Sequence, residues 1–389
     1  MRILITIYEK PEFGGAEVST ETLIKGLKDR GHEVFVASAR DWSRVTKTFK
    51  FWGFRTKLPI FWLQQIYLSR FLKKVIKKNN IELIHAQDRL TIPGAIKAAK
   101  CMKIPSVVSI RDYWFACPNS SCCSLYGEIY DTYRFKQLFK ERPFNRIVWN
   151  FYKMIELKRI RGILKKADLK LPVSGCVKHK LYINRIKDNV KAIPITRDLS
   201  KFFIKHKKES HTPFTITFVG NLATNKGIME VLKWMPDFLK EHPGIRFWVV
   251  GDGVLRSKVE EITKDKIMIF MLGKYLHKDM PSIYDSTDVL IFPSIWEEPY
   301  GGVVIEAMAA GIPVIVSDRG GHLDIISHCW NGVVLNPYAY DEWKQWIDTI
   351  KKDCPIHIGK NAQKTIKEEY DLNKIINQIE KEYLRLINV

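Results

Sequence analysis

The sequence lacks any apolar run that approaches the roughly 18–20 residues of a membrane-spanning helix. It opens with MRILITIYEK, which reaches charged side chains at once, so we expect no cleaved signal peptide. The seven cysteines are odd in number and scattered, which is more typical of reduced thiols than of a disulfide framework. Cys117, Cys122 and Cys123 form no CxxC pair and have no histidine nearby, which favours loop thiols over a zinc site. We therefore expect a cytoplasmic protein without a bound metal.

The excess of basic over acidic residues is confined to the first half of the chain. The 389 residues carry a net charge of +21. Residues 1–200 contain 39 Lys and Arg against 17 Asp and Glu, whereas the remainder contains 24 against 25. Such an asymmetric field indicates an anionic partner. Because no nucleic-acid recognition motif accompanies the charge, we expect phosphates or an anionic membrane surface and no nucleic acid.

Two segments of the basic half, 40–62 and 134–166, mix cationic and aromatic residues. This combination is typical of surfaces that bind anionic lipid headgroups. Aromatic residues that face the core beneath a solvated basic surface would produce the same pattern, and the helix predicted over 62–78 also fits an ordinary crossover helix. The sequence leaves both interpretations open.

Strands and helices alternate in each half of the chain, which is typical of α/β domains with a parallel sheet. The polar segment 205–213 indicates a linker between the halves. We therefore predict two doubly wound Rossmann-like domains, 1–204 and 205–372, with an amphipathic C-terminal helix at about 373–389. The predicted strands are 2–8, 32–39, 81–87, 104–110, 214–220, 245–253, 266–273, 289–294 and 312–318, and the helices are 18–31, 62–78, 95–103, 226–244, 254–265 and 303–311.

The stretch FPSIWEEPYGGVVIEAMAAGIPVIVSD (292–318) combines the features of a binding site. A predicted strand ends in a loop that carries Glu298, and Gly301 and Gly302 then lead into a helix. The N–H groups at a helix start favour an anion such as a phosphate, and glycines let the backbone approach it. Glu306 follows about one turn inside, among apolar and small residues. We predict that the two acids bracket a diphosphate ligand; alternatively, Glu298 is a helix cap and Glu306 a solvated position.

This stretch resembles the E-x7-E signature of the GT4 family of retaining glycosyltransferases. The resemblance covers nearly the whole chain, and its further motifs are GGAE (14–17), IRDYWFACP (110–118), FVGNLATNKG (218–227), VVGDGVLR (249–256) and DSTDVLIFPSIWEE (285–298). It implies the α/β GT-B fold, in which two Rossmann-like domains face each other across a cleft and the C-terminal helix crosses back to the N-terminal domain. The N-terminal domain would then serve the acceptor and the C-terminal domain the nucleotide-sugar donor.

The resemblance also implies roles for individual residues. Lys226 should hold the donor's pyrophosphate, Glu306 its ribose and Glu298 the transferred sugar, and Arg111 should act beside the reacting sugar with Lys226 and Glu298. The remaining donor-site residues are Gly14, Gly15, Gly220, Asn221, Gly301, Gly302 and Val303, and the acceptor-side residues are Asp112, Tyr113 and Trp114. The chain departs from the family at three places, because Asn221 replaces a phosphate-binding arginine, Arg111 replaces a histidine, and PITRD (194–198) lacks the family's asparagine.

The function that the resemblance implies is transfer of a hexose from a UDP- or GDP-sugar to a hydroxyl of a glycan or lipid-linked acceptor, with retention at the anomeric carbon. No Asp-x-Asp pair occurs in the sequence, so we expect no metal that bridges the diphosphate. Two alternatives remain. One is a basic protein of the same fold that binds membrane surfaces or polyanions with little or no turnover, and the other is an epimerase or phosphorylase of that fold. The nucleotide, sugar, acceptor and linkage are not encoded in recognisable motifs.

Overall fold

The computed structural model describes residues 1–10, 15–52, 60–117, 144–204, 213–353 and 356–388. These residues divide into two compact units. The N-terminal unit runs to Asp198 and resumes at Leu372, and the C-terminal unit is Leu199–Asp371. Of the predicted linker 205–213, residues 205–212 lie outside the described part of the chain, and the observed division comes before it.

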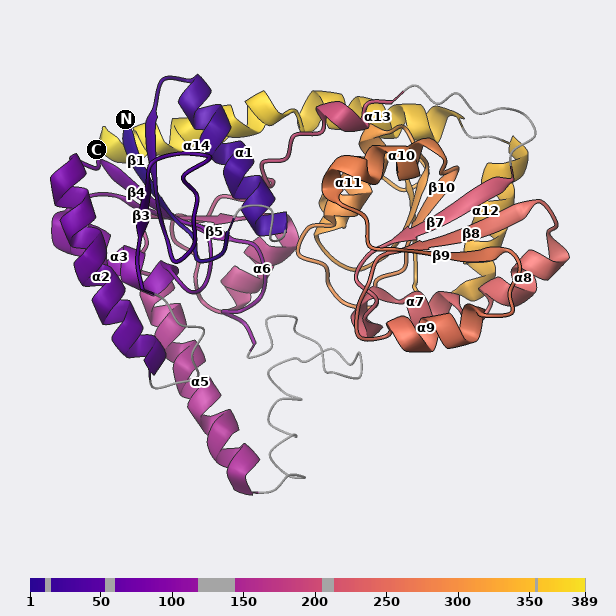
Figure 1. The fold of residues 1–389 in the computed structure, drawn as a ribbon, viewed down its shortest axis with the longest axis horizontal. Helices are drawn as coiled ribbons and strands as arrows, with labels where there is room; N and C mark the ends of the chain where they lie inside the picture. Colours follow the sequence, from indigo (N-terminus) through magenta and orange to yellow (C-terminus); the bar gives the residue numbers. More distant parts are fainter. Residues whose placement is uncertain (11–14, 53–59, 118–143, 205–212, 354–355, 389) are drawn as a thin grey trace. The chain divides into compact units, whose positions relative to one another are not determined.

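The N-terminal unit contains a parallel sheet with the strand order β3-β2-β1-β4-β5-β6. Figure 1 shows α1 and α14 on one face of this sheet and α2, α3 and α5 on the other. The strands are β1 (Arg2–Thr6), β2 (Glu33–Ser38), β3 (Thr48–Lys50), β4 (Leu83–Ala86), β5 (Ser106–Ile110) and β6 (Leu169–Pro172). The helices are α1 (Gly15–Asp29), α2 (Ile60–Asn79), α3 (Ile92–Met102), α5 (Phe144–Leu164), α6 (Gly175–Ile183) and α14 (Leu372–Ile387).

The C-terminal unit repeats this plan with the order β12-β11-β10-β7-β8-β9. Helices α10, α11 and α13 cover one face, and α7, α8 and α9 the other (Figure 1). The strands are β7 (Phe214–Val219), β8 (Ile245–Val250), β9 (Ile269–Gly273), β10 (Val289–Phe292), β11 (Val314–Ser317) and β12 (Val333–Leu335). The helices are η1 (Ser200–Phe202), η2 (Thr224–Lys226), α7 (Ile228–Val231), α8 (Met235–Glu241), α9 (Arg256–Thr263), η3 (His277–Asp279), α10 (Met280–Asp285), α11 (Gly302–Ala309), η4 (Gly321–Asp324), α12 (Tyr340–Asp353) and α13 (Ile356–Glu369).

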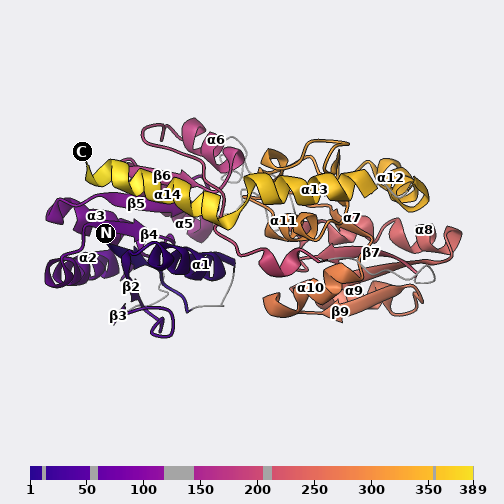
Figure 2. The same cartoon turned by 90° about the horizontal axis from the view of Figure 1, so that it is seen from above.

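The predicted C-terminal helix is confirmed as α14, which belongs to the N-terminal unit although it ends the chain. It lies along α1 in both views (Figures 1 and 2). Ile375, Ile376, Ile379 and Tyr383 bury one stripe of the helix in the core cluster formed with α1 and the sheet. Gly26 of α1 permits this close approach, because a Cβ there would lie 1.9 Å from Ile376 Cδ1.

The prediction of one helix over 226–244 is wrong. The segment holds the end of η2, then α7, and then α8, which begins only at Met235. Pro236 occupies the first turn of α8. Because proline has no N–H and its ring clashes with the preceding turn, a helix continuing from α7 could not pass through it. Gly227, with φ +76°, separates η2 from α7.

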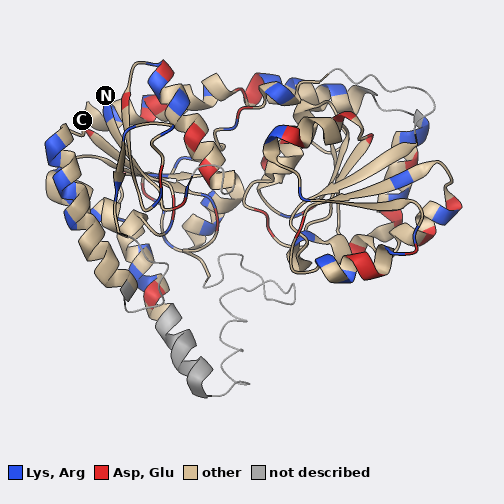
Figure 3. Ribbon diagram, in the orientation of Figure 1, with Lys and Arg blue, Asp and Glu red and all other residues tan. Residues whose placement is uncertain are grey.

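The basic excess of the first half is concentrated on helices of the N-terminal unit (Figure 3). Helix α2 contains no Asp or Glu, and its cationic residues are Arg70, Lys73, Lys74, Lys77 and Lys78. No helix in the described part of the chain combines the length and the apolarity that crossing a membrane requires.

Candidate active site

In the C-terminal unit, β7 and β10 are adjacent, and the chain leaves them toward opposite edges of the sheet. Ligands of such sheets bind beyond the carboxyl ends of the two strands at this reversal. The loop after β7 carries Gly220, Asn221 and Lys226, and the loop after β10 carries Glu298. The topology therefore brings these sequence-predicted residues to one edge of the sheet.

Lys226 and Glu298 are in direct contact. The Lys226 ammonium donates to Glu298 Oε1, and its charge lies 5.4 Å from the centre of the Trp296 ring. Glu298 Oε1 also accepts from Trp296 Nε1 at 2.8 Å and from Ser294 Oγ at 3.3 Å. No donor among the described residues bonds Oε2 of this carboxylate. The pair thus presents a cation and one carboxylate oxygen that can contact a ligand.

Three glycines allow the loops of this site to approach each other. A Cβ at Gly227 would lie 1.9 Å from the carbonyl oxygen of Pro293, and one at Gly320 would lie 2.3 Å from the amide nitrogen of Glu298. Gly301 has φ +92° and would place a Cβ 3.0 Å from that of the buried His322. Each position also has a positive φ that favours glycine. Glu298 is therefore held by backbone contacts as well as by its side-chain partners.

Glu306 lies inside α11 and is only 2% exposed. Its Oε1 is 3.0 Å from His277 Nε2, and its Oε2 accepts from the Tyr284 hydroxyl at 2.9 Å. Phe202 packs against the rings of both partners. Each carboxylate oxygen can accept more than one hydrogen bond, so these contacts orient the acid without exhausting it.

The alternative in which Glu298 caps a helix and Glu306 is solvated is wrong. Glu298 is 5% exposed, and the N-cap of α11 is Gly301, with no side-chain capping bond. Gly302 and Val303, the first two residues of α11, are partly exposed, and backbone N–H groups in a first turn lack intrahelical acceptors. The start of α11 thus offers amides and a positive dipole end to an anion.

The loop after β7 packs closely on the loop after β8. Gly251, with φ +144°, lies so near Gly220 that a Cβ would be 1.8 Å from the Gly220 carbonyl oxygen. Asn221 is exposed beside this contact, and Gly220 is partly exposed. Asp252 binds within its own turn, where it accepts from the Gly253 amide at 2.8 Å, and it pairs with Arg256 at 3.5 Å. This acid therefore stabilises a turn.

In the N-terminal unit, Arg111 follows β5 and reaches back to α1. Its guanidinium donates to the Ala16 carbonyl in the first turn of α1 and, at 2.5 Å, to Gln87 Oε1 after β4. Burial lowers the pKa of Arg111 to about 10, whereas Glu17 and Asp88 favour its charged form, so it remains cationic at neutral pH. Gly15, the exposed first residue of α1, is therefore close to a fixed positive charge. Gly14 lies outside the described residues.

The predicted acceptor-side residues differ in exposure. Asp112 is partly exposed and accepts from the Trp114 amide at 2.9 Å. Tyr113 and Trp114 are 0% and 5% exposed, and the Tyr113 hydroxyl lies 3.2 Å from Cys176 Sγ. Burial raises the pKa of Asp112 to about 6. Of the three side chains, only Asp112 is placed to meet a ligand.

His85 and Ser174 have structural roles. His85 is fully buried, with Nδ1 2.5 Å from the Tyr383 hydroxyl of α14 and Nε2 2.9 Å from Ser109 Oγ. Burial lowers its pKa to about 3, so it is neutral. Ser174 caps α6 by accepting from the Val177 amide at 3.2 Å.

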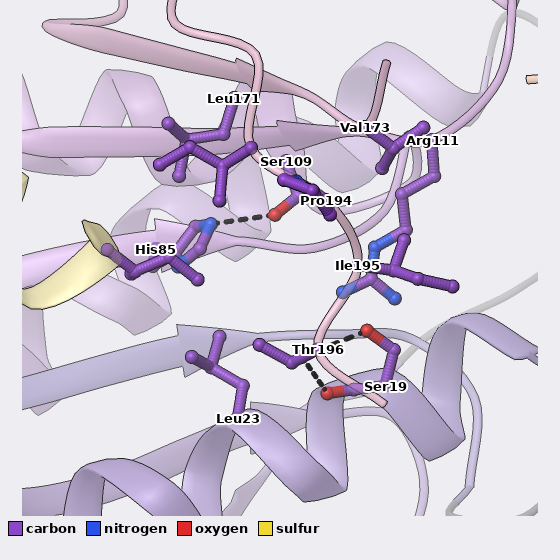
Figure 4. A pocket seen from close by; sticks show the side chains of 12 residues that line it. Ser19, Leu23, His85, Ser109, Arg111, Leu171, Val173, Pro194, Ile195 and Thr196 are labelled. Atoms are coloured by element: carbon purple, nitrogen blue, oxygen red, sulfur yellow. Dashed lines mark hydrogen bonds between the residues drawn. The ribbon is translucent and has the colours of Figure 1, made fainter. Parts of the chain in front are cut away.

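Figure 4 shows a small cavity in the N-terminal unit, with Arg111 at one end and His85 toward the other. Its volume is about 20 Å³, which is room for about one water molecule and not for a sugar. Thr196, in the segment where the family asparagine is missing, closes one side by donating to the Ser19 carbonyl at 2.6 Å. This cavity belongs to the packing beneath Arg111.

The cysteines in the described ranges, Cys101, Cys117, Cys176 and Cys329, are reduced thiols, as predicted. Cys122, Cys123 and Cys354 lie outside those ranges. Within them, no group of three or more His, Cys, Asp or Glu side chains has a geometry suited to a metal ion.

The sequence reasoning missed three residues of the site: His277, Tyr284 and Trp296. Trp296 lies two residues before Glu298 and could have been inferred from that proximity. His277 and Tyr284 come from η3 and α10, and only the packing of α10 on α11 brings them to Glu306. No local signal in LHKDMPSIYD indicates this contact.

Two family models match the chain and together extend from residue 13 to residue 369. The model described as Glycosyltransferase Family 4 matches residues 13–200, and the model described as Glycosyl transferases group 1 matches residues 200–369. The chain belongs to the group 1 glycosyltransferases. The match of this second model contains the switch-point loops and both acids, so the predicted family membership is confirmed.

This glycosyltransferase has relatives that match most of its length. It is 24% identical to a glycosyltransferase of Methanocaldococcus jannaschii, over 97% of this chain and 96% of the relative. It is 23% identical to the UDP-Gal:α-D-GlcNAc-diphosphoundecaprenol α-1,3-galactosyltransferase of Escherichia coli, over 81% of this chain and 78% of that enzyme. Its structure resembles that of Anabaena HepE in complex with UDP, with a TM-score of 0.77, 18% identity, and coverage of 99% and 100%. The predicted GT-B fold is confirmed.

Proposed function

We propose that this glycosyltransferase transfers a hexose from a UDP- or GDP-sugar to a hydroxyl of a glycan or lipid-linked acceptor, with retention at the anomeric carbon and without a metal ion. The observation that carries the proposal is the contact of Lys226 with the buried Glu298 at the β7/β10 switch point. Two comparisons support the donor and acceptor classes. The E. coli relative is named as a UDP-Gal-dependent transferase to a lipid-linked sugar, and structures of HepE contain UDP and UDP-glucose.

The donor's diphosphate is assigned to Lys226 and to the first amides of α11. Lys226 has three ammonium protons, so it can contact phosphate oxygens while it keeps one hydrogen bond to Glu298. The N–H groups of Gly302 and Val303 add dipoles whose positive ends favour the same charge. Asn221, which replaces the family's arginine, contributes no charge, so the cationic share of the C-terminal unit rests mainly on Lys226.

The two acids are assigned to the ends of the donor. Glu306, fixed by His277 and Tyr284, accepts from the ribose hydroxyls. Glu298 offers Oε2 to the hydroxyls of the transferred sugar, while Oε1 stays with Trp296 and Lys226. Because both carboxylates are held by several partners before a ligand binds, little ordering is required on binding.

In the proposed reaction, the bond between the anomeric carbon and the diphosphate oxygen breaks with oxocarbenium character at the sugar. The acceptor oxygen forms its bond to the anomeric carbon on the same face, and its proton passes to the departing phosphate oxygen. The leaving diphosphate therefore serves as the base, and no protein carboxylate needs that role. Lys226 and the α11 amides stabilise the negative charge as it develops. Arg111, which stands where the family has a histidine, is proposed as a second cation that stabilises the same charge.

A nucleotide-sugar panel tests the proposal. Thermal shift with UDP-, GDP- and ADP-sugars should reveal stabilisation by at least one donor, because a ligand that binds only the folded state raises its melting temperature. Glu306→Ala should abolish that shift, whereas Glu261→Ala, which removes an exposed acid of the same unit, should retain it. Transfer that stops in chelator and resumes with magnesium would contradict metal independence.

The alternative, a protein of this fold that binds polyanions or membranes without turnover, is not favoured. It gives no reason for a buried acid such as Glu306 to be held by two polar partners inside α11. If the protein neither binds nor hydrolyses any donor of the panel, the alternative of a binding protein without turnover would be favoured instead.

A further inference from the structure

Helix α2 has two faces with different compositions. Leu68, Leu72, Val75 and Ile76 are buried and support its packing as a crossover helix on α3. The opposite stripe is exposed and changes along the helix, because Leu63, Ile66 and Tyr67 occupy its first half and Arg70, Lys74, Lys77 and Lys78 its second. Leu63 is 64% exposed. Among the described residues, none of these four cations forms an ion pair.

Helix α5 repeats this order of residues over its described side chains. Met154 and Ile155 are 41% and 51% exposed. The exposed residues that follow are mainly basic, with Lys158 and Arg159 in the next turn and Lys165 and Lys166 just beyond the helix. Glu156, the one acid in this described stretch, is buried. In both helices, exposed apolar residues therefore come before exposed cations in the sequence.

The two helices contact each other and begin at the same side of the unit. The Arg159 guanidinium lies 3.8 Å above the Trp62 ring, which joins α5 to the first turn of α2. Both helices run upward from their first residues in Figure 1, so in each helix the exposed apolar residues lie below the cations that follow them. Figure 3 shows Lys and Arg on the part of α2 farther from its first residues. The exposed apolar residues of the two helices are therefore bordered by basic residues.

We propose that the exposed faces of α2 and α5, with their apolar residues and the cations beside them, dock on an anionic lipid bilayer. Exposed apolar side chains can enter the boundary between headgroups and acyl chains, and the neighbouring Lys and Arg then meet the anionic headgroups. A nucleic acid would complement the cations but would give Leu63, Ile66 and Ile155 no apolar partner. The proposal is independent of the proposed reaction, because it requires no donor, acceptor or turnover.

Vesicle flotation of the full chain tests the surface. Wild-type protein should bind phosphatidylcholine vesicles that contain one quarter phosphatidylglycerol, and should bind pure phosphatidylcholine vesicles much less. The variant R70Q/K74Q/K77Q/K78Q should lose roughly 600-fold in affinity for the anionic vesicles, since each of the four cations near such a surface is worth roughly fivefold. The matched control K258Q/K264Q/K351Q/K352Q removes four exposed lysines from the C-terminal unit and should bind like wild type.

A second variant distinguishes a bilayer from other anionic partners. L63Q/I66Q keeps every cation, so it should bind anionic vesicles at least about tenfold more weakly while heparin binding is unchanged. Equal vesicle binding by the two charge variants, or vesicle binding unaffected by L63Q/I66Q, would overturn the proposal, and the second result would point to a polyanion. Unchanged melting temperatures establish that the variants are folded. Donor hydrolysis in solution should persist in all of them, which separates failure of this surface from failure of the active site.

Discussion

Removing the charge of Lys226 and removing the charge of Glu298 should have different effects on the affinity for the nucleotide. In Lys226→Met the cation is lost and the aliphatic stem can still pack on Trp296. In Glu298→Gln the side-chain oxygen can still accept from Trp296 and Ser294, but the counter-charge of Lys226 disappears. If Lys226 binds the donor's diphosphate, the first variant loses a phosphate contact. The second variant, Glu298→Gln, leaves the Lys226 ammonium with the phosphates as its only anionic partners.

The burial of the two side chains sets the expected losses of unfolding free energy, and the lost phosphate contact sets the expected loss of nucleotide affinity. Removing one partner of a buried ion pair costs about 3–5 kcal/mol. The side chain of Lys226 is 21% exposed and that of Glu298 7%, so water partly solvates the remaining ion and we expect each variant to lose about 1–3 kcal/mol of unfolding free energy. A hydrogen bond to a charged group contributes about 1.5–3 kcal/mol, so Lys226→Met should bind the nucleotide roughly 10–100-fold more weakly. Glu298→Gln should bind it as tightly as wild type or severalfold more tightly.

Isothermal titration with the nucleoside diphosphate that wild-type protein binds, chosen from UDP, GDP and ADP, measures the affinities. Urea unfolding of both single variants and of the double variant measures the coupling between the two charges. Transfer activity should fall in both single variants. Wild-type nucleotide affinity in Lys226→Met, or an equal loss in Glu298→Gln, would refute the assignment of Lys226 to the diphosphate.

Three further predictions concern stability. Gly320→Ala should lower the free energy of unfolding in urea by several kcal/mol, since the new Cβ would clash with the Glu298 backbone. Gly244 also has a positive φ but lies in open space, so Gly244→Ala should cost only about 1 kcal/mol. Equal costs for the two variants would contradict the close approach of Gly320 to Glu298. Asp112 has a pKa raised by burial to about 6, so the folded state holds its proton more tightly and stability falls as pH rises from about 4 to 6. Asp112→Asn should therefore raise the unfolding free energy by roughly 1–3 kcal/mol at pH 7.5 and leave it unchanged near pH 4, and a gain at both pH values would be inconsistent with a titrating carboxyl. Tyr383→Phe should cost about 1–3 kcal/mol by removing the buried partner of His85 Nδ1, and a melting temperature equal to wild type would show that this bond contributes nothing.

The strands that the sequence did not predict share a position in the fold. β3, β6 and β12 are three or four residues long, and each lies at the edge of its sheet. An edge strand pairs on one side only, so it needs neither the length nor the apolar run that marks a central strand. The helix wrongly extended over 226–244 shows a related limit, because its apolar periodicity continued through Pro236 although the backbone could not.

The candidate site also has a part that the sequence indicated and a part that it did not. Glycines, a lysine and two acids at fixed spacing were readable as a diphosphate site because such a site needs a close backbone approach and charge at set intervals along one loop and one helix. The sequence also indicated the alternation of strands and helices and the apolar stripe of α14.

Only the tertiary structure decided which side chains hold those acids. Lys226 is 72 residues from Glu298, and His277 is 29 from Glu306. Contacts between loops of different strands depend on strand order and helix packing, which local patterns do not specify. The packing also placed Tyr113 and Trp114 in the core and left Leu63 of α2 and Ile155 of α5 exposed. Burial is a property of the assembled layers and not of any one segment.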